Sequence, residues 1–223
     1  MDIGELLKDP QELDYLFERA ILLKDKKLAE ILYPYIESPS LLLDYAYLKN
    51  QPLDERGESI IAQDPQKSYH YAKYILKGPF PKGEDTIAQS FEWGYKYALD
   101  VLQGPFPKGE DAISQNAWSS YFYASLVLKG PFPKGEDAIA KVDEYSYLYA
   151  KNVLKGPFPK GEDAIAKDPN LSYKYAKDVL RDRFIKGEKV IISDKESLSS
   201  YIDFLKSIGK LEEFYNDHPE LKK

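Results

Sequence analysis

Apolar and polar positions recur along this chain every 26 residues. A block that reads approximately GPFPKGEDAIA begins at Gly78, Gly104, Gly130 and Gly156, and weaker copies on the same phase begin at Pro52 and Asp182. A strict period of this length is typical of a stacked array, in which each unit buries its apolar face against its neighbours. The pattern predicts an all-α solenoid of about six αα-hairpin repeats, and it excludes most enzyme folds.

Each repeat is predicted to begin with a long helix. The spacing places these helices at residues 39–49, 65–77, 91–103, 117–129, 143–155 and 169–181. A residue that can cap the first helical turn precedes most of them, at Ser38, Asp64, Ser90, Asn116, Asp168 and Asp194, and only Val142 breaks the column. Such side chains accept hydrogen bonds from the free amides of that turn. The glycine of the Gly-Pro pair that follows is expected to end the helix.

A short second helix is predicted after each GPFPKG turn. Glu84 and its equivalents open this helix, where a carboxylate opposes the positive end of the helix dipole. The exact phase is lost at both ends of the chain. We therefore expect an N-terminal helical cap over residues 1–37, tandem repeats over 38–206, and a C-terminal cap with a polar tail over 207–223.

One face of the long helix carries small residues flanked by tyrosines. Ser68 and Ala72 recur as small residues in each later repeat, and this seam is expected to let helix backbones approach closely. Two tyrosine columns, which pass through Tyr69 and Tyr71, are interpreted as core. The alternative is a platform on which nucleic acid bases stack. The Phe80 column is expected to fill the turn against the neighbouring unit, and the Lys82 and Glu84 columns to pair along the surface.

The outward face of the long helix is where the repeats disagree. The fourth repeat has Trp118, Phe122 and Leu126 at positions that are mainly polar in its siblings, and Trp93 and Leu148 in the adjacent repeats extend this apolar surface. An exposed patch with central aromatics is typical of a protein contact site. We therefore predict that these five residues bind a protein partner. The alternative is that a chain terminus, or a crystal or oligomer contact, covers them.

The composition limits which classes of partner and which cellular compartment are expected. The net charge is −6, and no segment has the basic excess that phosphate neutralisation needs, which argues against nucleic acid as the main partner. The chain has no cysteine, no signal peptide pattern at its start and no apolar run near the ~20 residues that span a bilayer. A cytoplasmic protein that does not associate with membranes is expected.

The sequence shows no pattern that indicates catalysis, a metal or a cofactor. His70 and His218 are the only histidines and lie far apart in the array, so neither a zinc site nor a Ser-His-Asp arrangement is predicted. The recurring Gly-Glu-Asp lacks the ligand alternation of a calcium loop. We expect no catalytic, metal-binding or cofactor-binding residues, and hence a protein that is not an enzyme.

The repeat unit at Lys155–Leu180 resembles tandem α-helical repeats found in proteins of tailed bacteriophages. The resemblance covers approximately residues 38–206. It implies a phage protein that acts inside an infected bacterium, where such proteins bind and disable host proteins, including antiviral defence systems. The leading hypothesis is a non-enzymatic binding protein. The alternatives are a repeat protein that binds single-stranded nucleic acid and a structural or self-assembling phage component, and the oligomeric state stays open.

Overall fold

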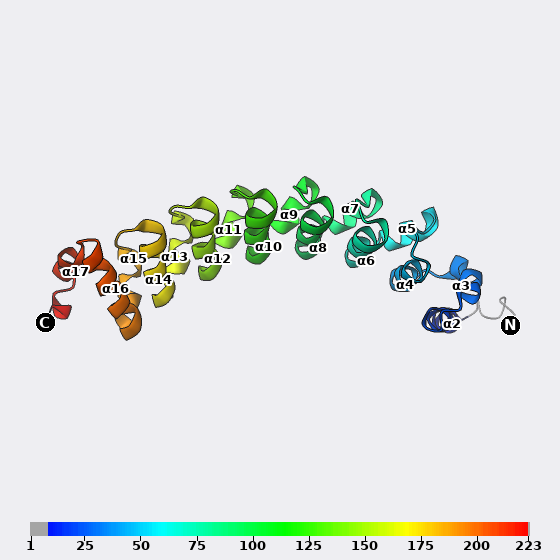
Figure 1. Ribbon diagram of the computed structural model, residues 1–223, viewed down its shortest axis with the longest axis horizontal. Coiled ribbons are helices and arrows are strands. Elements are labelled where there is room, and N and C mark those ends of the chain that lie inside the picture. Colours follow the sequence, from blue (N-terminus) through cyan, green and yellow to red (C-terminus); the bar gives the residue numbers. More distant parts are fainter. Residues whose placement is uncertain (1–8, 223) are drawn as a thin grey trace. The chain divides into compact units, whose positions relative to one another are not determined.

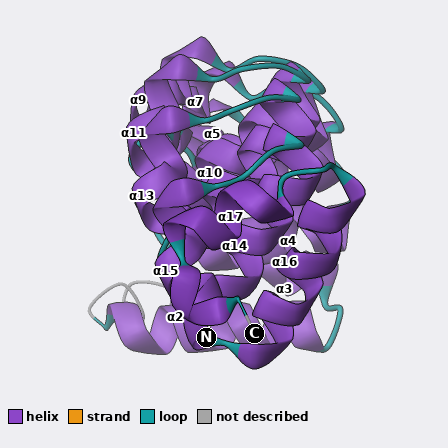
Figure 2. Ribbon diagram, turned by 90° about the vertical axis from the view of Figure 1, so that its left-hand side faces the viewer, coloured by secondary structure: helices purple, strands orange, loops and turns teal. Residues whose placement is uncertain are grey.

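The computed structural model describes residues 9–222, and every regular element in this range is a helix, with loops between them (Figure 2). The predicted all-α solenoid fold is confirmed, because short helices pack against one another in chain order. The contacts divide the chain into two compact units, residues 1–112 and 113–223, and each unit contains its own stacked repeats.

The first unit places its long helices side by side, with the short helices as a second row along them (Figure 1). Its α-helices are α2 (Pro10–Leu22), α3 (Lys26–Leu32), α4 (Pro39–Lys49), α5 (Glu55–Ile61), α6 (Pro65–His70), α7 (Pro81–Ile87) and α8 (Phe91–Tyr97), and α9 (Glu110–Ile113) begins at its end.

The second unit repeats this arrangement and closes with two longer helices and a short one. Its α-helices are α10 (Ala117–Phe122), α11 (Glu136–Ile139), α12 (Asp143–Leu148), α13 (Glu162–Ile165), α14 (Pro169–Tyr175), α15 (Ile185–Ser193), α16 (Lys195–Ser207) and α17 (Leu211–Asp217).

Five of the long helices continue as π-helix, in which each hydrogen bond spans five residues instead of four. These stretches are Tyr71–Leu76, Ala98–Leu102, Tyr123–Leu128, Tyr149–Leu154 and Ala176–Leu180. The α-helical and π-helical parts together match the predicted long helices to within one residue. The sequence pattern did not predict the change from α to π.

The way these helices end corrects one expectation. The left-handed residue is not the glycine but the residue before it, for example Lys77 with φ 54° and Lys129 with φ 53°. The carbonyl of Ala72 then accepts from Lys77 N–H and from Gly78 N–H, the second at 3.1 Å. The glycine therefore follows the left-handed turn and does not itself adopt the positive φ.

The predicted N-caps are confirmed. Asp64 accepts from Lys67 N–H at 2.8 Å, Asn116 from Ser119 N–H at 3.1 Å, and Asp168 from Leu171 N–H at 2.7 Å. Ser38, Ser90 and Asp194 cap their helices in the same way. Val142, the exception in the column, makes no such bond.

The small-residue seam is also confirmed, and its packing partner is the short helix. Ser146 is fully buried and its Oγ donates to the carbonyl of Ile139, at 3.0 Å, in the preceding short helix. A Cβ at Gly161 would lie 2.6 Å from the Ser146 Cβ and 2.5 Å from the Phe158 ring. Glycine and serine together therefore allow the two helices of one repeat to touch through their backbones.

The Tyr71 column forms the centre of the core. Tyr149 is fully buried, its hydroxyl oxygen accepts from Phe132 N–H at 2.9 Å, and its hydroxyl donates to Glu136 at 3.2 Å. Its ring meets the Phe158 ring edge to face, with centroids 5.1 Å apart. The phenylalanine ring thus fills the hairpin of its own repeat, while its backbone amide is bound by the tyrosine of the next repeat.

The lysine and acidic columns pair between successive repeats, as predicted. Lys160 lies 3.0 Å from Asp137 and 3.3 Å from Glu136 of the repeat before it. Lys186 repeats this with Asp163 at 2.8 Å. These pairs are exposed, so each contributes little to stability.

The C-terminus folds back further than the expected polar tail. Glu188, at the Glu84 position of the last repeat, is only 2% exposed and receives a bidentate pair of hydrogen bonds from Arg183, at 2.8 and 2.9 Å. Tyr201 donates to it at 2.9 Å, and His218 Nε2 lies 3.1 Å away. Phe214 of α17 is fully buried. Residues 208–222 therefore form a cap on the last repeat.

Candidate protein-binding surface

The second-unit stripe, defined here as Trp118, Phe122 and Leu126, follows the outward side of one long helix. Trp118 and Phe122 belong to α10, and Leu126 belongs to the π-helical stretch that continues it. The rings of Trp118 and Phe122 lie 5.3 Å apart, so the structure brings these two predicted residues together. Leu126 is 47% exposed, whereas Trp118 and Phe122 are half-buried.

This gradient of exposure has a local cause. The expected outward positions assume the α-helical rotation per residue, and a π-helix rotates less because its hydrogen bonds span five residues. Side chains before and after the transition therefore do not keep one common face. Phe122 also packs against Tyr121, with ring centroids 5.0 Å apart, which places part of its ring in the tyrosine column.

Leu148 lies on α12, the helix that packs against α10. It is half-buried. Tyr145 of the same helix stacks on Tyr121 at 5.8 Å with an interplanar angle of 25°. The neighbouring helix thus carries an aliphatic and an aromatic side chain beside Tyr121 and its neighbours, and the extension of the binding surface by Leu148 stays a prediction.

Trp93 lies in the first unit, on α8. It is half-buried among aromatic rings: its centroid is 5.4 Å from Tyr69 and 5.6 Å from His70, and the ammonium of Lys96 sits 4.3 Å above it. Lys96 is also paired with Glu92 at 2.6 Å. Trp93 is therefore part of a packed aromatic group within its own unit.

That group extends into a surface that sequence reasoning missed, the first-unit aromatic row of Tyr47, Tyr74, His70 and Trp93. Ring centroids are 6.3 Å apart between Tyr47 and Tyr74, and 5.8 Å between Tyr74 and His70. Tyr47 is 42% exposed and Tyr74 is 48% exposed. A comparison of columns would have found it, because Tyr47 and Tyr74 stand where the next junction has Lys73 and Asp100.

The surroundings of the histidine in this row favour its neutral form. Burial lowers the pKa of His70 from its usual value, and the positive charges of Lys67, Lys96 and Lys73 lower it further. The row is therefore an uncharged aromatic surface, and the neighbouring Lys73 is already paired with Asp100 at 2.8 Å.

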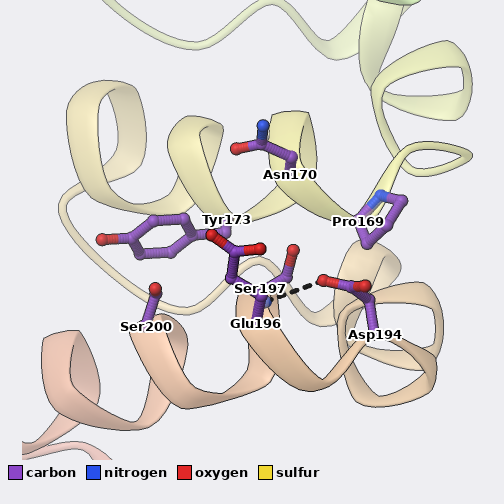
Figure 3. Close-up of a pocket in the computed structure, with 7 residues that line it drawn as sticks. All are labelled: Pro169, Asn170, Tyr173, Asp194, Glu196, Ser197 and Ser200. Carbon is purple, nitrogen blue, oxygen red and sulfur yellow. Dashed lines mark hydrogen bonds between the residues drawn. The ribbon is translucent and has the colours of Figure 1, made fainter.

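A polar pocket of about 270 Å³ opens in the second unit between α14 and α16 (Figure 3). Tyr173 and Asn170 line it from α14, and Glu196 and Ser200 from α16. Asp194 also lines it, but its carboxylate accepts from Ser197 N–H at 2.8 Å as a helix cap. Next to Ser200 in the sequence, Ser199 stands where the tyrosine column would continue. The lining of the pocket indicates no particular ligand.

Within residues 9–222, no group of three or more histidines, aspartates and glutamates is arranged to hold a metal ion. Over the same residues no helix is both long and apolar enough to cross a membrane. No protein family model, curated protein or solved structure matches the chain.

Proposed function

We propose that this chain is a non-enzymatic helical-repeat protein that binds another protein through the second-unit stripe. The observation that carries the proposal is Leu126, which is 47% exposed four residues after Phe122 on a helix whose other large apolar residues are buried or half-buried. The equivalent positions in the next two repeats hold the polar residues Asn152 and Asp178. An exposed apolar side chain beside two aromatic rings matches the anatomy of interface hot spots.

The origin that we propose for the protein rests on its repeat sequence. Because the unit resembles repeats of tailed bacteriophage proteins, we propose a phage-encoded protein that acts in the host cytoplasm. Its partner would be a host protein, with components of antiviral defence as the first to test. Leu148, which lies in the same unit, is proposed to extend the binding surface.

The test is a comparison of three forms of the full chain in expressing bacteria. Leu126→Asp places a charge at the most exposed residue of the stripe and should abolish capture of the partner. Ile185→Asp is the matched control, because Ile185 is a 70% exposed apolar residue of the same unit outside the stripe. The partner should be captured by the wild type and by the control.

Affinity measurements with the purified protein and its partner then give the size of the effect on binding. Truncation of a hot-spot aromatic costs about 2 kcal/mol or more, so Trp118→Ala or Phe122→Ala should weaken binding by about 30-fold or more. Equal affinity of all forms would place the partner elsewhere. Sedimentation that shows self-association lost in Leu126→Asp would instead favour a self-assembling component.

Single-stranded nucleic acid stays as a second candidate because of one observation: lysines lie over the rings of the first-unit aromatic row, Lys96 over Trp93 and Lys73 over Tyr74. Stacked bases use such surfaces. Both lysines are, however, already paired with Glu92 and Asp100. Binding of a single-stranded oligonucleotide that weakens as salt is added, and that is lost in Trp93→Ala, would support this candidate.

A further inference from the structure

The first unit contains an apolar groove near its N-terminal end, between the end of α2 and α4. The groove has a volume of about 450 Å³, and its apolar lining is Ile21, Leu22, Tyr47 and Leu48. Leu22 is 69% exposed, and Leu23 beside it is 70% exposed. Tyr47 connects the groove to Tyr74 and hence to the first-unit aromatic row.

The repeats themselves show that this surface is not required by the fold. At the junction of α6 with α8, Lys73 donates to Tyr69 at 2.9 Å and pairs with Asp100 at 2.8 Å, which closes the outer surface with polar groups. One repeat earlier, Tyr47 and Tyr74 occupy the positions of that lysine and aspartate. Two exposed rings therefore replace an ion pair that the same backbone accommodates elsewhere. Exposed apolar surface of this kind marks a contact site.

The charges around the groove indicate the chemistry of the partner. Glu18 and Asp44 line the groove, and Asp14 lies one turn before Glu18 on α2. None of the three forms an ion pair with another described residue, unlike Asp100, which is paired. Two cations lie near, Lys24 in the groove lining and Lys67, whose charge acts on Asp44. Residues 1–50 as a whole hold ten acidic and six basic side chains.

The electrostatic state of these carboxylates agrees with a missing cationic partner. Burial raises the pKa of Asp14. Burial also raises the pKa of Asp44, and the charge of Glu18 adds to this shift while Lys67 opposes it. A cation placed beside these groups would stabilise their charged form.

We propose that this groove binds the apolar face of a basic amphipathic helix from a partner protein. Leucine or aromatic side chains of that helix would fill the space between Leu22 and Tyr47, and its lysines or arginines would face Glu18 and Asp44. Helices bind in grooves in this way through apolar anchors three or four residues apart. This inference concerns a different surface from the second-unit stripe and does not rest on it.

The experiment uses two fluorescein-labelled 15-residue helical peptides with the full-length protein. Both peptides carry leucines at the same positions, and the remaining positions are lysine and alanine in one and glutamate and alanine in the other. We expect the lysine peptide to bind at least tenfold more tightly than the glutamate peptide. Its affinity should fall as salt is added, because the carboxylates of the rim are near the surface.

Three variants locate the site. Leu22→Asp should weaken binding of the lysine peptide at least tenfold. Glu18→Lys combined with Asp44→Lys should remove the preference of the protein for the lysine peptide over the glutamate peptide. Ile185→Asp, a change at equal exposure in the other unit, should have no effect. Because Leu22 and Ile185 are exposed, circular dichroism should show unchanged melting in both.

The proposal is overturned if neither peptide binds at 100 µM, if both bind equally, or if Leu22→Asp binds like the wild type. Trp118→Ala separates this result from the proposed function. It should leave peptide binding intact even where it abolishes capture of the partner through the second-unit stripe.

Discussion

Two junctions between repeats of the second unit share an inner half and differ in their outer half. At both, the buried serine donates to the carbonyl of an isoleucine at 3.0 Å, for Ser146 with Ile139 and for Ser172 with Ile165. At the outer side of the junction between α12 and α14, Lys151 and Tyr147 both donate to Asp178, each at 2.7 Å. At the junction between α10 and α12, Tyr121 accepts from Asn152 at 3.0 Å.

This difference shows that the fold requires the inner groups of a junction and does not require the outer ones. The inner groups are buried backbone and hydroxyl atoms, and an unsatisfied atom there would be costly. The outer groups are partly exposed, so water can replace a lost partner. Sequence variation is therefore tolerated on the outer side, and this is the side on which binding residues can be placed without loss of the fold.

The largest effect is expected from overpacking the inner half. Ala124 and Ala150 are both fully buried at equivalent positions. Ala124→Leu and Ala150→Leu should each lower the free energy of unfolding by up to about 3 kcal/mol, because a packed seam cannot take the added volume. Urea denaturation measures this. A clear difference between the two variants would mean that the inner halves of the junctions are not equivalent.

A smaller effect is expected from the tyrosine hydroxyls. Tyr175 accepts from Phe158 N–H at 2.9 Å, and Tyr149 accepts from Phe132 N–H at the same distance. Tyr175→Phe or Tyr149→Phe leaves a buried amide without its acceptor, which should cost about 1–2 kcal/mol. Both variants should melt at lower temperature than the wild type. Wild-type melting would show that water reaches these amides.

The outer bridge, defined here as the contacts of Asp178 with Lys151 and Tyr147, should contribute less to stability than the inner groups. Its contribution should depend on pH. Burial alone would raise the pKa of Asp178, but hydrogen bonds from Lys151 and Tyr147 and the lysine charge outweigh it, so its pKa is lowered. A lowered pKa in the folded state gives stability that is present above the unfolded value near pH 3.9 and is lost as the pH falls through the folded value.

Asp178→Asn should therefore cost at most about 1 kcal/mol at pH 7. The difference from the wild type should disappear at a pH well below 4. Denaturation curves at pH 7 and at acidic pH provide the measurement. A cost that stays constant over this range would assign the effect to packing and not to the ion pair.

The smallest effect on stability is expected when the residues of the outer bridge are introduced at the junction between α10 and α12. Ser125→Lys with Asn152→Asp would place at Tyr121 the groups that surround Tyr147. The double variant should be stabilised by about 0.5 kcal/mol relative to the sum of the single changes, and high salt should remove the gain. A coupling of zero at low salt would show that the two outer halves differ in backbone geometry as well as in sequence.

The repeat architecture could be predicted from sequence because its signals are local and occur several times. The cap column, the Gly-Pro pairs and the apolar period each fix helix boundaries independently, and Val142 was correctly singled out as the uncapped start. The π-helical stretches could not be predicted, because the side chains of Tyr123–Leu128 are compatible with an α-helix and the widening depends on how the helix packs.

The candidate surface was predictable only in part, for the same reason. Leu126 is exposed as expected, but Trp118 and Phe122 are half-buried, since their rings pack on each other and Phe122 also packs on Tyr121. The groove at Leu22 was not predicted, because residues 1–37 lie off the repeat phase and offer no sibling for comparison. The replacement of Lys73 and Asp100 by Tyr47 and Tyr74 one repeat earlier is visible in the sequence, and the structure adds that the two rings lie 6.3 Å apart.

The buried Glu188 cluster has a consequence for how the gene can change. Glu84, Glu136 and Glu162 each pair with a lysine of the following repeat. Glu188 of the last repeat instead binds Arg183 of its own hairpin and His218 of the C-terminal segment. Termination is thus encoded locally. A duplication or deletion of one 26-codon unit upstream leaves that ending intact, so the array can lengthen or shorten in evolution while its end stays closed.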